Sequence, residues 1–464
     1  MAHDTPAPPP PPPTPILIIG AGPVGLFLAL LLAQANLPVL LLEASTSPDP
    51  APKAMTHLPS ILPDFRAAGV YDALVAAARG LVDQGICFRD AQTGVVLAEM
   101  PRPGKGVGEG PLTVPQPTFC NILRQKLQEF PHVTLRAGVA VKSLTQQRNG
   151  VEVLAEAFSS SPSSSDTLTF TARYVVAADG AHSAVRTAAG IPFEGATLPR
   201  RLVACDVRYD FTGRAGWVGG NFLAGREWAG LVGPILAPEA GAEGEGEDEG
   251  DGVGEGIGEG VGNGKGKKTV GLWRVSFSVP EEEWLDTPAA LDALVRQRLG
   301  KMLPEGGPDP LDACTIERVA PYRAQQLCAA TFRKANVLLV GDAAHLTNPY
   351  AGLGLNTGLL DASSLATVLS AHLLRGAPPQ LLDAWARARR DTFVNAVDPV
   401  SRAAFWSLLD PDVATLRERH PVLRAVGGGA GGGVGGRDGA VKGKPAKGPM
   451  ALRTDVRALE GWVD

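Results

Sequence analysis

Several short apolar runs in this chain end at a polar or glycine-containing turn. The first run, Ile16–Ile19, leads into the turn Gly20–Gly25, which a long apolar segment, Leu26–Gln34, follows. The next run, Leu37–Leu42, ends at Glu43. Runs of this length, separated by a segment of helix length, predict a strand, a helix and a strand with a right-handed crossover in a parallel sheet.

A similar junction lies near the middle of the chain. The apolar run 175–178 ends at Asp179 and Gly180, a pair that favours a turn. Ser183 follows at a position where its side chain can cap a helix that carries Arg186. The pattern therefore predicts a third strand that runs into a loop and a short helix.

A further junction of this kind lies at residues 335–361. The run 335–340 reads as a buried strand that ends at Gly341-Asp342. A turn at Asn348-Pro349 then precedes the glycine-rich start of a helix, 352–358. A carboxylate and several backbone N–H groups would point at one polar ligand in this arrangement.

The rest of the chain alternates between helical and strand patterns. Residues 199–330 hold more strand-like runs than helices, which favours a mostly antiparallel second part. The other predicted elements are helices within 58–79, 119–130, 355–375 and 381–409, strands at 133–137, 139–146, 151–158 and 168–178, and a β excursion over 85–100.

Composition limits the class of protein. With 44% hydrophobic and 20% charged residues, the 464-residue chain has an ordinary globular composition. Its net charge is −5, but the Gly/Glu-rich segment 239–268 alone holds nine acidic residues and three lysines. We expect that segment to be disordered, as well as the proline-rich residues 1–14. The remainder is close to neutral, so we expect no nucleic-acid partner.

The cysteines, the histidines and the apolar segments bear on the cell compartment, on metal binding and on membrane insertion. Five scattered cysteines without C-x-x-C spacing favour reduced thiols in a cytoplasmic protein. No two histidines have metal-ligand spacing, so we expect no metal site. Pro38 and two amide residues interrupt the apolar segment 26–44, so we expect no membrane span. The oligomeric state stays undefined.

The first turn has the chemistry of a dinucleotide site. Gly20, Gly22 and Gly25 occupy the three positions of G-x-G-x-x-G, which permit a tight turn, a close approach to a pyrophosphate and close packing of helix on strand. Glu43 ends the second strand, where a carboxylate accepts hydrogen bonds from ribose hydroxyls. This pattern alone does not distinguish FAD from NAD.

The three junctions together resemble a known family. In order, the chain carries G-A-G-P-V-G from Gly20, A-D-G-A-H-S-A-V-R from Ala178, and G-D-A-A-H followed by N-P and G-L-G-L-N-T-G from Gly341. This set resembles the single-component FAD-dependent aromatic hydroxylases, the class A flavoprotein monooxygenases related to para-hydroxybenzoate hydroxylase and phenol hydroxylase. The resemblance covers about 15–80, 112–195 and 320–395.

The resemblance implies a fold and a division into domains. The fold is α/β, with a Rossmann-like FAD-binding domain of the G-x-G-x-x-G type, an inserted β-sheet-rich substrate domain and C-terminal helices. The discontinuous FAD domain would comprise 15–84, 112–195 and 320–409, and the substrate domain 85–111 and 196–319. Residues 410–464 would form a largely flexible tail.

The resemblance also implies site residues. Gly20, Gly22 and Gly25 would cradle the FAD pyrophosphate, and Glu43 would bind the adenosine ribose. Pro349 would lie beside the site of oxygen chemistry. Tyr350 follows Pro349 and is for that reason the preferred tyrosine as a contact for a phenolic substrate, although packing is its plainer interpretation. Arg124 and Gln116 would lie near the ribityl and ring region of the flavin. The other implied cofactor-binding residues are Lys53, Asp179, Gly180, Arg186, Asp342, Gly354, Leu355 and Asn356.

The implied reaction is hydroxylation of an aromatic, phenolic or related secondary metabolite. NADPH or NADH would reduce FAD, and O2 would then form a flavin hydroperoxide that passes one oxygen to the substrate. The alternatives are a reductase or oxidase of the same fold and a non-catalytic flavin-binding protein. An NAD-dependent dehydrogenase would use Gly20–Glu43 but would leave the two later motifs unexplained.

Some positions depart from the family or have plainer interpretations. Lys53 stands where relatives often have arginine, and Leu353 where they often have glutamine. We expect His345 to be a buried histidine behind the loop rather than a catalytic base. The remaining expectations are exposed loop positions for His57 and His182, packing roles for Tyr209 and Tyr322, and a solvated helix face for Arg389-Arg390.

Overall fold

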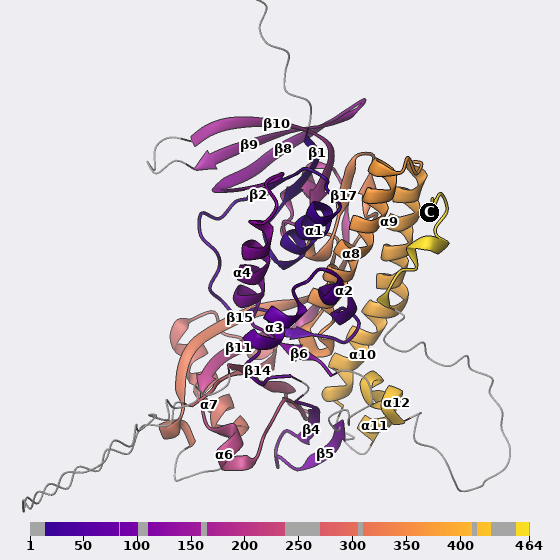
Figure 1. Cartoon of the computed structure of the whole chain (residues 1–464). Helices are drawn as coiled ribbons and strands as arrows, with labels where there is room; N and C mark the ends of the chain where they lie inside the picture. Colours follow the sequence, from indigo (N-terminus) through magenta and orange to yellow (C-terminus); the bar gives the residue numbers. More distant parts are fainter. Residues whose placement is uncertain are drawn as a thin grey trace, which may run out of the picture.

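The computed structural model describes residues 14–82, 84–100, 110–158, 165–236, 270–304, 310–410, 415–427 and 452–463. These residues form two eight-stranded sheets, one in the upper and one in the lower half of Figure 1, and helices cover the upper one. A separate two-stranded sheet pairs β3 (Thr56–His57) with β6 (Leu112–Thr113). The predicted α/β class is therefore confirmed.

The first sheet has a parallel centre. Its strand order is β16-β17-β10-β1-β2-β7, and the pairs from β17 to β7 are parallel. Ile16, Ile18 and Val176 are fully buried, as expected of central parallel strands covered on both faces. The strands are β1 (Thr14–Ile19), β2 (Val39–Glu43), β7 (Val133–Ala137), β8 (Val139–Gln147), β9 (Gly150–Phe158), β10 (Ser165–Ala177), β16 (Arg333–Lys334) and β17 (Val337–Leu339).

Helices follow the sequence predictions closely on this sheet. The predicted first helix is α1, whose residues Leu26 to Leu30 are all buried because it packs between two other helices, α4 and α8. The strands β8 and β9 form the predicted hairpin next to β10. The helices of this region are α1 (Pro23–Gln34), α2 (Leu62–Ala67), α3 (Tyr71–Ala77), α4 (Gln116–Leu127), α5 (Ala184–Ala188) and α8 (Leu353–Leu374).

The second sheet is mainly antiparallel, as predicted. Its order is β18-β15-β11-β14-β13-β12-β4-β5, so the excursion over 85–100 joins the strands of 193–329 in one sheet. Helix α7 (Pro288–Met302) covers one face with Val295 and Leu299. The strands are β4 (Ile86–Asp90), β5 (Val96–Met100), β11 (Phe193–Arg208), β12 (Gly220–Ala224), β13 (Gly230–Leu236), β14 (Leu272–Pro280), β15 (Thr315–Ala329) and β18 (His345–Leu346).

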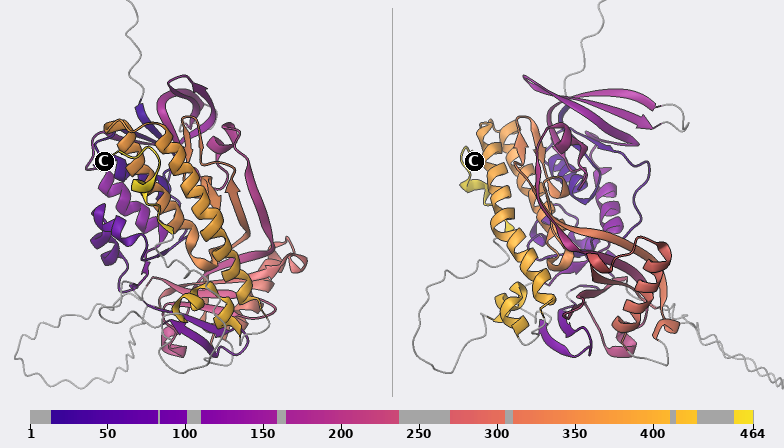
Figure 2. Two further views of the ribbon diagram at one scale, coloured as in Figure 1. Left: turned by 90° about the vertical axis from the view of Figure 1, so that its right-hand side faces the viewer. Right: turned by 180° about the vertical axis from the view of Figure 1, so that it is seen from behind.

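The two halves of the molecule share continuous strands. β11 and β15 pass through the domain boundaries that we expected at 195/196 and 319/320. The two long strands run out of the lower half of the molecule in the right-hand view of Figure 2. At their far end β15 pairs with β18, a strand of the same sheet that follows the Gly341 loop. The division into domains stays a prediction, but the expected junctions are strands rather than linkers.

The C-terminal helices form one long arm. α9 (Gln380–Thr392) continues through a π-helical turn, Phe393–Val397, into α10 (Asp398–Leu408), and this arm runs down the side of the molecule in Figure 2. Two short helices follow, α11 (Leu416–Arg419) and α12 (Pro421–Gly427). The prediction that 410–464 is largely flexible stays a prediction, but hydrogen bonds from Arg389 and Arg453 join the segment 452–463 to α9 and α2.

Two predictions concern residues that are not described. Residues 1–13 and 239–268 lie outside the described ranges, so the expected disorder there stays a prediction. Within the described ranges, no helix is both long and apolar enough to cross a membrane. The segment 26–44 divides into the end of α1 and β2, as the interrupting polar residues predict.

Candidate functional site

The turn after β1 brings backbone groups to the surface of a cleft. Gly20 has φ +103°, and a Cβ there would lie 2.3 Å from the carbonyl oxygen of Ala178. A Cβ at Gly25 would lie 2.0 Å from the carbonyl oxygen of Gly20, so helix and turn touch here. Gly22 has open space around its Cβ position, and α1 begins directly after it without a side-chain cap. The first N–H groups of α1 therefore lack intrahelical acceptors beside the cleft.

Glu43 at the end of β2 is tied to this turn. Its Oε2 accepts a hydrogen bond of 2.7 Å from Ala21 N, and its Oε1 accepts one of 2.9 Å from Ser45 N. Arg124 of α4 donates from Nη2 to the carbonyl oxygen of Ala21 at 3.2 Å. Glu43, Arg124, Gln116 and Lys53 line a hollow of about 390 Å³. This hollow is thus framed by one fixed carboxylate and a nearby guanidinium.

The loop after β10 presents a buried carboxylate. Asp179 Oδ2 accepts from Val185 N at 3.1 Å, whereas its Oδ1 is buried without a hydrogen-bond partner among the described residues. Burial raises the pKa of this carboxyl, although hydrogen bonds from Ser183 and Val185 oppose the shift. Ser183 caps α5 by accepting from Arg186 N at 2.9 Å, as predicted. Asp179 therefore holds a carboxylate at the end of β10, beside the wall of the cleft.

Asp342 occupies the corresponding position after β17. Gly341 adopts φ +59° at the start of a 3-10 turn, η3 (Gly341–Ala343). The Asp342 side chain is open to the cleft but closely surrounded by protein atoms. Although the side chain is exposed, the protein atoms around it desolvate the carboxyl and raise its pKa, against the opposing effects of His345 and Lys53. The site thus holds a second carboxylate at the surface of the cleft.

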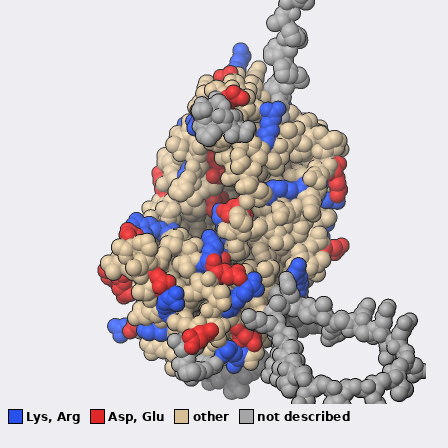
Figure 3. Space-filling model, turned by 90° about the vertical axis from the view of Figure 1, so that its left-hand side faces the viewer, with Lys and Arg blue, Asp and Glu red and all other residues tan. Residues whose placement is uncertain are grey.

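The three loops meet at one cleft of about 580 Å³. They meet because β17, β10 and β1 are neighbours in the sheet, so their carboxyl ends lie side by side. The cleft shares Gly22, Glu43, Lys53 and Gln116 with the smaller hollow, so the two form one elongated site. Figure 3 shows this side of the molecule, with acidic and basic side chains around a hollow near its middle. The predicted residues that line the larger part are Gly20, Gly22, Glu43, Lys53, Gln116, Asp179, Gly180, Asp342 and Leu355.

Some predicted site residues lie behind the cleft surface. Arg186 donates to the carbonyl oxygens of Ala343 and Ala181, at 3.0 and 2.9 Å, and so joins two loops. The Asn356 side chain accepts from Leu58 N at 2.8 Å and does not face the cleft. Gly25, Gly354, Pro349 and Tyr350 are also absent from its lining.

The tyrosines and Lys53 have identifiable neighbours. Tyr350 is 1% exposed, and its hydroxyl donates to the carbonyl oxygen of Ala229 at 3.2 Å. Tyr209 donates to the carbonyl oxygen of Pro304. Lys53 Nζ lies 2.7 Å from Asp49 Oδ2, with both side chains at least half exposed. Tyr209 and Tyr350 therefore have the contacts of packing residues, and Lys53 remains accessible from the cleft.

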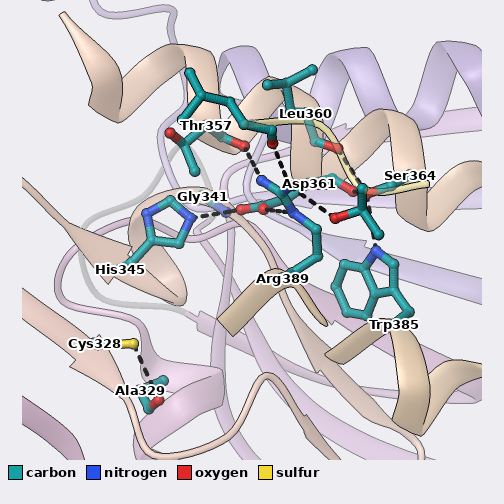
Figure 4. A network of polar contacts seen from close by, with 12 residues as sticks. Cys328, Ala329, Gly341, His345, Thr357, Leu360, Asp361, Ser364, Trp385 and Arg389 are labelled. Carbon is teal, nitrogen blue, oxygen red and sulfur yellow. Dashed lines mark hydrogen bonds and ion pairs between the residues drawn. The ribbon is translucent and has the colours of Figure 1, made fainter. Parts of the chain in front are cut away.

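A buried ionic network lies behind the Gly341 loop (Figure 4). Asp361 of α8 accepts from His345 Nε2, from Arg389 Nε and from Gly341 N, at 2.7, 2.7 and 3.1 Å. Burial by itself would raise the pKa of Asp361, but Arg389 and His345 hold it below its ordinary value. The interpretation of His345 as a buried, hydrogen-bonded residue is confirmed.

Two expectations about side-chain exposure are wrong. Arg389 is completely buried, although we expected a solvated face. The sequence contains a signal for this, because Arg389 follows the buried Trp385 by four residues and so lies on the same helix face. His57 is also completely buried, between the rings of Phe65 and Phe119, rather than exposed in a loop.

Comparisons with known proteins agree with this geometry. Residues 13–399 match the family model described as FAD binding domain. The chain is 32% identical over 408 residues to para-nitrophenol 4-monooxygenase of a Pseudomonas species, covering 84% of this chain and 86% of the relative. It is 29% identical over 383 residues to 6-hydroxy-3-succinoylpyridine 3-monooxygenase of Pseudomonas putida, covering 81% and 84%.

Solved structures show the same fold. The crystal structure of p-nitrophenol 4-monooxygenase from Pseudomonas putida superimposes with a TM-score of 0.72 at 28% identity, covering 89% of this chain and 94% of that one. A ternary complex of aklavinone-11 hydroxylase with FAD and aklavinone gives 0.67 at 22% identity, covering 86% and 70%, and so supports the fold alone. The chain therefore belongs to the FAD binding domain family, as a flavoprotein monooxygenase of the aromatic hydroxylase type.

Proposed function

We propose that this protein hydroxylates a small phenolic or related aromatic compound with NADPH or NADH and O2. The observation that carries the proposal is the cleft at which the loops of Gly20, Asp179 and Asp342 meet. Relatives that span most of the chain are monooxygenases of p-nitrophenol and of a hydroxypyridine, and this similarity supports a phenol-like substrate.

The cleft suits FAD in three ways. The open space at Gly22 leaves room for a pyrophosphate against the backbone. The uncapped start of α1 offers N–H groups and the positive end of a helix dipole to an anion. The Asp179 carboxylate lines the cleft, where a carboxylate can accept a hydrogen bond from a ligand hydroxyl. These groups match the phosphates and the sugar hydroxyls of a dinucleotide.

We assign the following residues to the cofactor. Glu43 would hold the adenosine ribose. Arg124, Gln116 and Lys53 line the same end of the cleft, so we assign Arg124 and Gln116 to this end rather than to the ribityl and ring region that the resemblance implies. Asp342 would hold the ribityl chain, and the backbone of Leu355 at the start of α8 would face the flavin ring. FAD, when bound, supplies the transfer of electrons from the nicotinamide to oxygen. The residues of this chain supply position and exclusion of water.

The substrate would lie between the cleft and the second sheet. Pro349 is exposed on the short turn η4 (Pro349–Ala351), beyond the Gly341 loop. The adjoining Tyr350 is anchored to Ala229, which directly precedes β13 of the second sheet, and burial raises the pKa of its hydroxyl. We therefore assign Tyr350 to the wall of this region, and Tyr322, which is 38% exposed on β15, becomes the better tyrosine to test for substrate contact.

The test begins with flavin binding. Purified protein is incubated with FAD, desalted and examined for bound flavin, and a colourless product contradicts the proposal. NADPH and NADH oxidation are then measured with a panel of phenols that includes p-nitrophenol, and products are examined by mass spectrometry for a gain of one oxygen atom. Substrate-stimulated oxidation with hydroxylated product supports the proposal.

The same experiment distinguishes the alternatives. Nicotinamide oxidation without oxygen in the product would indicate a reductase or oxidase of this fold. Bound FAD without any nicotinamide oxidation would indicate a flavin-binding protein that is not an enzyme.

The five free cysteines, Cys87, Cys120, Cys205, Cys314 and Cys328, support the cytoplasmic location that we propose.

A further inference from the structure

Asp361 contacts the Gly341–Asp342 loop on the side away from the cleft, and Asp342 lies on the cleft side of the same loop. The Asp361 carboxylate is completely buried and accepts from the backbone N–H of Gly341, the residue next to Asp342. A Cβ at Gly358, on the same helix, would lie 2.9 Å from Gly341 Cα, so α8 and the loop are in close contact. A displacement of Asp361 would therefore displace the start of the loop.

Arg389 balances the charge of Asp361 and extends the network to the end of the chain. Its Nε donates to Asp361 Oδ1 at 2.7 Å, and its Nη2 donates to the carbonyl oxygen of Thr357 at 3.3 Å. Its Nη1 donates to the carbonyl oxygen of Leu452 at 2.7 Å and to Thr454 Oγ1 at 3.2 Å. All donors of a completely buried guanidinium need acceptors, and the segment 452–454 provides two of them.

The residue between these two contacts provides a second anchor. Arg453 forms an ion pair with Asp64 of α2, and its Nη1 donates to the carbonyl oxygen of Ser60 at 2.7 Å. Ser363 of α8 donates to the same Asp64 carboxylate. The segment 452–454 therefore contacts α2 through Arg453 and α9 through Arg389, on either side of α8.

We propose that Asp361 and Arg389 are positioning residues for the cofactor loop Gly341–Asp342, and that residues 452–454 belong to the same apparatus. The chain of contacts runs from Leu452 and Thr454 to Arg389. It continues from Arg389 through Asp361 to Gly341 N, as Figure 4 shows. The inference rests on the proposed binding of FAD by Asp342. It assigns the distal end of the chain, more than ninety residues after the last cofactor motif, to FAD retention.

The test uses full-length variants and FAD affinity. Thr454→Val removes one acceptor of Arg389, Arg453→Ala removes the anchor on α2, and Arg389→Lys replaces the fork by a point charge that cannot make all its contacts. Asp361→Asn keeps the shape but loses the charge. Each apoprotein is titrated with FAD at a temperature well below its own melting temperature, so that lower stability alone does not change the measured Kd.

A matched control is available in the same two elements. Arg387 of α9 pairs with Glu460 of the C-terminal segment at 3.7 Å, but both side chains are largely exposed. We expect Arg387→Ala to leave the FAD Kd within about twofold of the wild type, since exposed pairs contribute little. We expect Asp361→Asn and Arg389→Lys to raise it at least about tenfold, and Arg453→Ala and Thr454→Val about threefold or more.

The outcomes separate this inference from the proposed function. If the wild type does not bind FAD, the proposed function fails. If the wild type binds FAD and all four network variants keep its Kd within twofold, the network is only structural and the inference is overturned, whatever the melting temperatures. If Asp361→Asn or Arg389→Lys does not fold, the two milder variants decide, because Arg453 and Thr454 lie at the edge of the network.

Discussion

Arg274 on β14 donates a hydrogen bond of 2.5 Å to the main-chain oxygen of Lys53, across the boundary between the second sheet and the cleft. The same guanidinium holds Asp206 of β11 through Nε and Nη2, at 2.9 and 2.7 Å from Oδ1. Both side chains of this pair are nearly inaccessible to solvent. The sheet that carries the proposed substrate face is therefore fixed to the loop that lines the cofactor cleft.

We expect Arg274→Met to lower the free energy of unfolding by about 3 kcal/mol, because it leaves the buried Asp206 with only the more distant Arg318 as a partner. Urea unfolding at neutral pH measures this loss. The double variant Asp206→Leu/Arg274→Met should recover most of it, since a buried ion pair can be replaced by apolar residues of similar volume. A single variant that loses less than about 1 kcal/mol would show that Arg318, 3.5 Å from Asp206, replaces Arg274.

The centre of the site was predictable because it depends on local sequence. Gly20, Asp179 and Asp342 each follow directly on a buried strand, and parallel neighbours place their loops at one edge of the sheet. The helix cap at Ser183 and the close packing at Gly25 are likewise local features with a recognised pattern. Strand, turn and helix patterns were therefore sufficient for these positions.

The supporting contacts were not predictable in the same way. The Arg274–Lys53 bond joins residues 221 positions apart, and the Arg389–Leu452 bond joins residues 63 apart. No local pattern specifies such partners, because they depend on how complete elements pack. The helical spacing of Trp385 and Arg389 indicates burial of Arg389, but it does not indicate that Asp361 and Leu452 are the partners.

The glycines of the first turn provide a test that separates folding from cofactor binding. We expect Gly22→Ala to change the stability of the apoprotein by less than about 0.5 kcal/mol, because nothing lies within 4 Å of the new Cβ. The methyl group would instead occupy the space of the pyrophosphate and raise the FAD Kd at least about tenfold. Thermal unfolding and FAD titration measure the two effects.

Gly25→Ala should behave in the opposite way. Its Cβ would meet the carbonyl oxygen of Gly20 at 2.0 Å, so the apoprotein should lose at least about 2 kcal/mol of stability. If Gly22→Ala destabilises the apoprotein as much as Gly25→Ala does, the open space at Gly22 is not a ligand site.

We expect the ionised Asp342 to lower the stability of the apoprotein and to strengthen the binding of FAD. Because the protein atoms around this exposed carboxyl desolvate it and raise its pKa above the ordinary 3.8, the folded protein binds this proton more tightly than the unfolded chain. Ionisation of Asp342 therefore destabilises the fold. This destabilisation is complete at pH values above the raised pKa and is absent well below pH 3.8. We expect Asp342→Asn to raise the melting temperature of the apoprotein at pH 7 and to weaken FAD binding.

The control for Asp342 is Asp391→Asn, at an exposed position on α9. This change should leave both the melting temperature and the FAD Kd unaltered. The gain from Asp342→Asn should also become smaller as the pH falls. A lower melting temperature for Asp342→Asn at pH 7 would contradict the assignment of Asp342 as a carboxylate held for a ligand.

His57 should make the fold sensitive to acid. Burial lowers its pKa from 6.5 to about 4, and burial does the same for His420. The folded protein binds these protons less tightly than the unfolded chain, so stability is complete above pH 6.5 and falls as the pH decreases towards 4. At about pH 4.5 each of these two histidines should lower the free energy of unfolding by about 2–3 kcal/mol relative to its value above pH 6.5. The phenylalanine of His57→Phe fits between Phe65 and Phe119. Urea unfolding of this variant, measured above pH 6.5 and at about pH 4.5, should therefore lack the loss of free energy that is due to His57. An unchanged pH dependence in that variant, with His420 intact, would show that His57 is not a neutral buried residue.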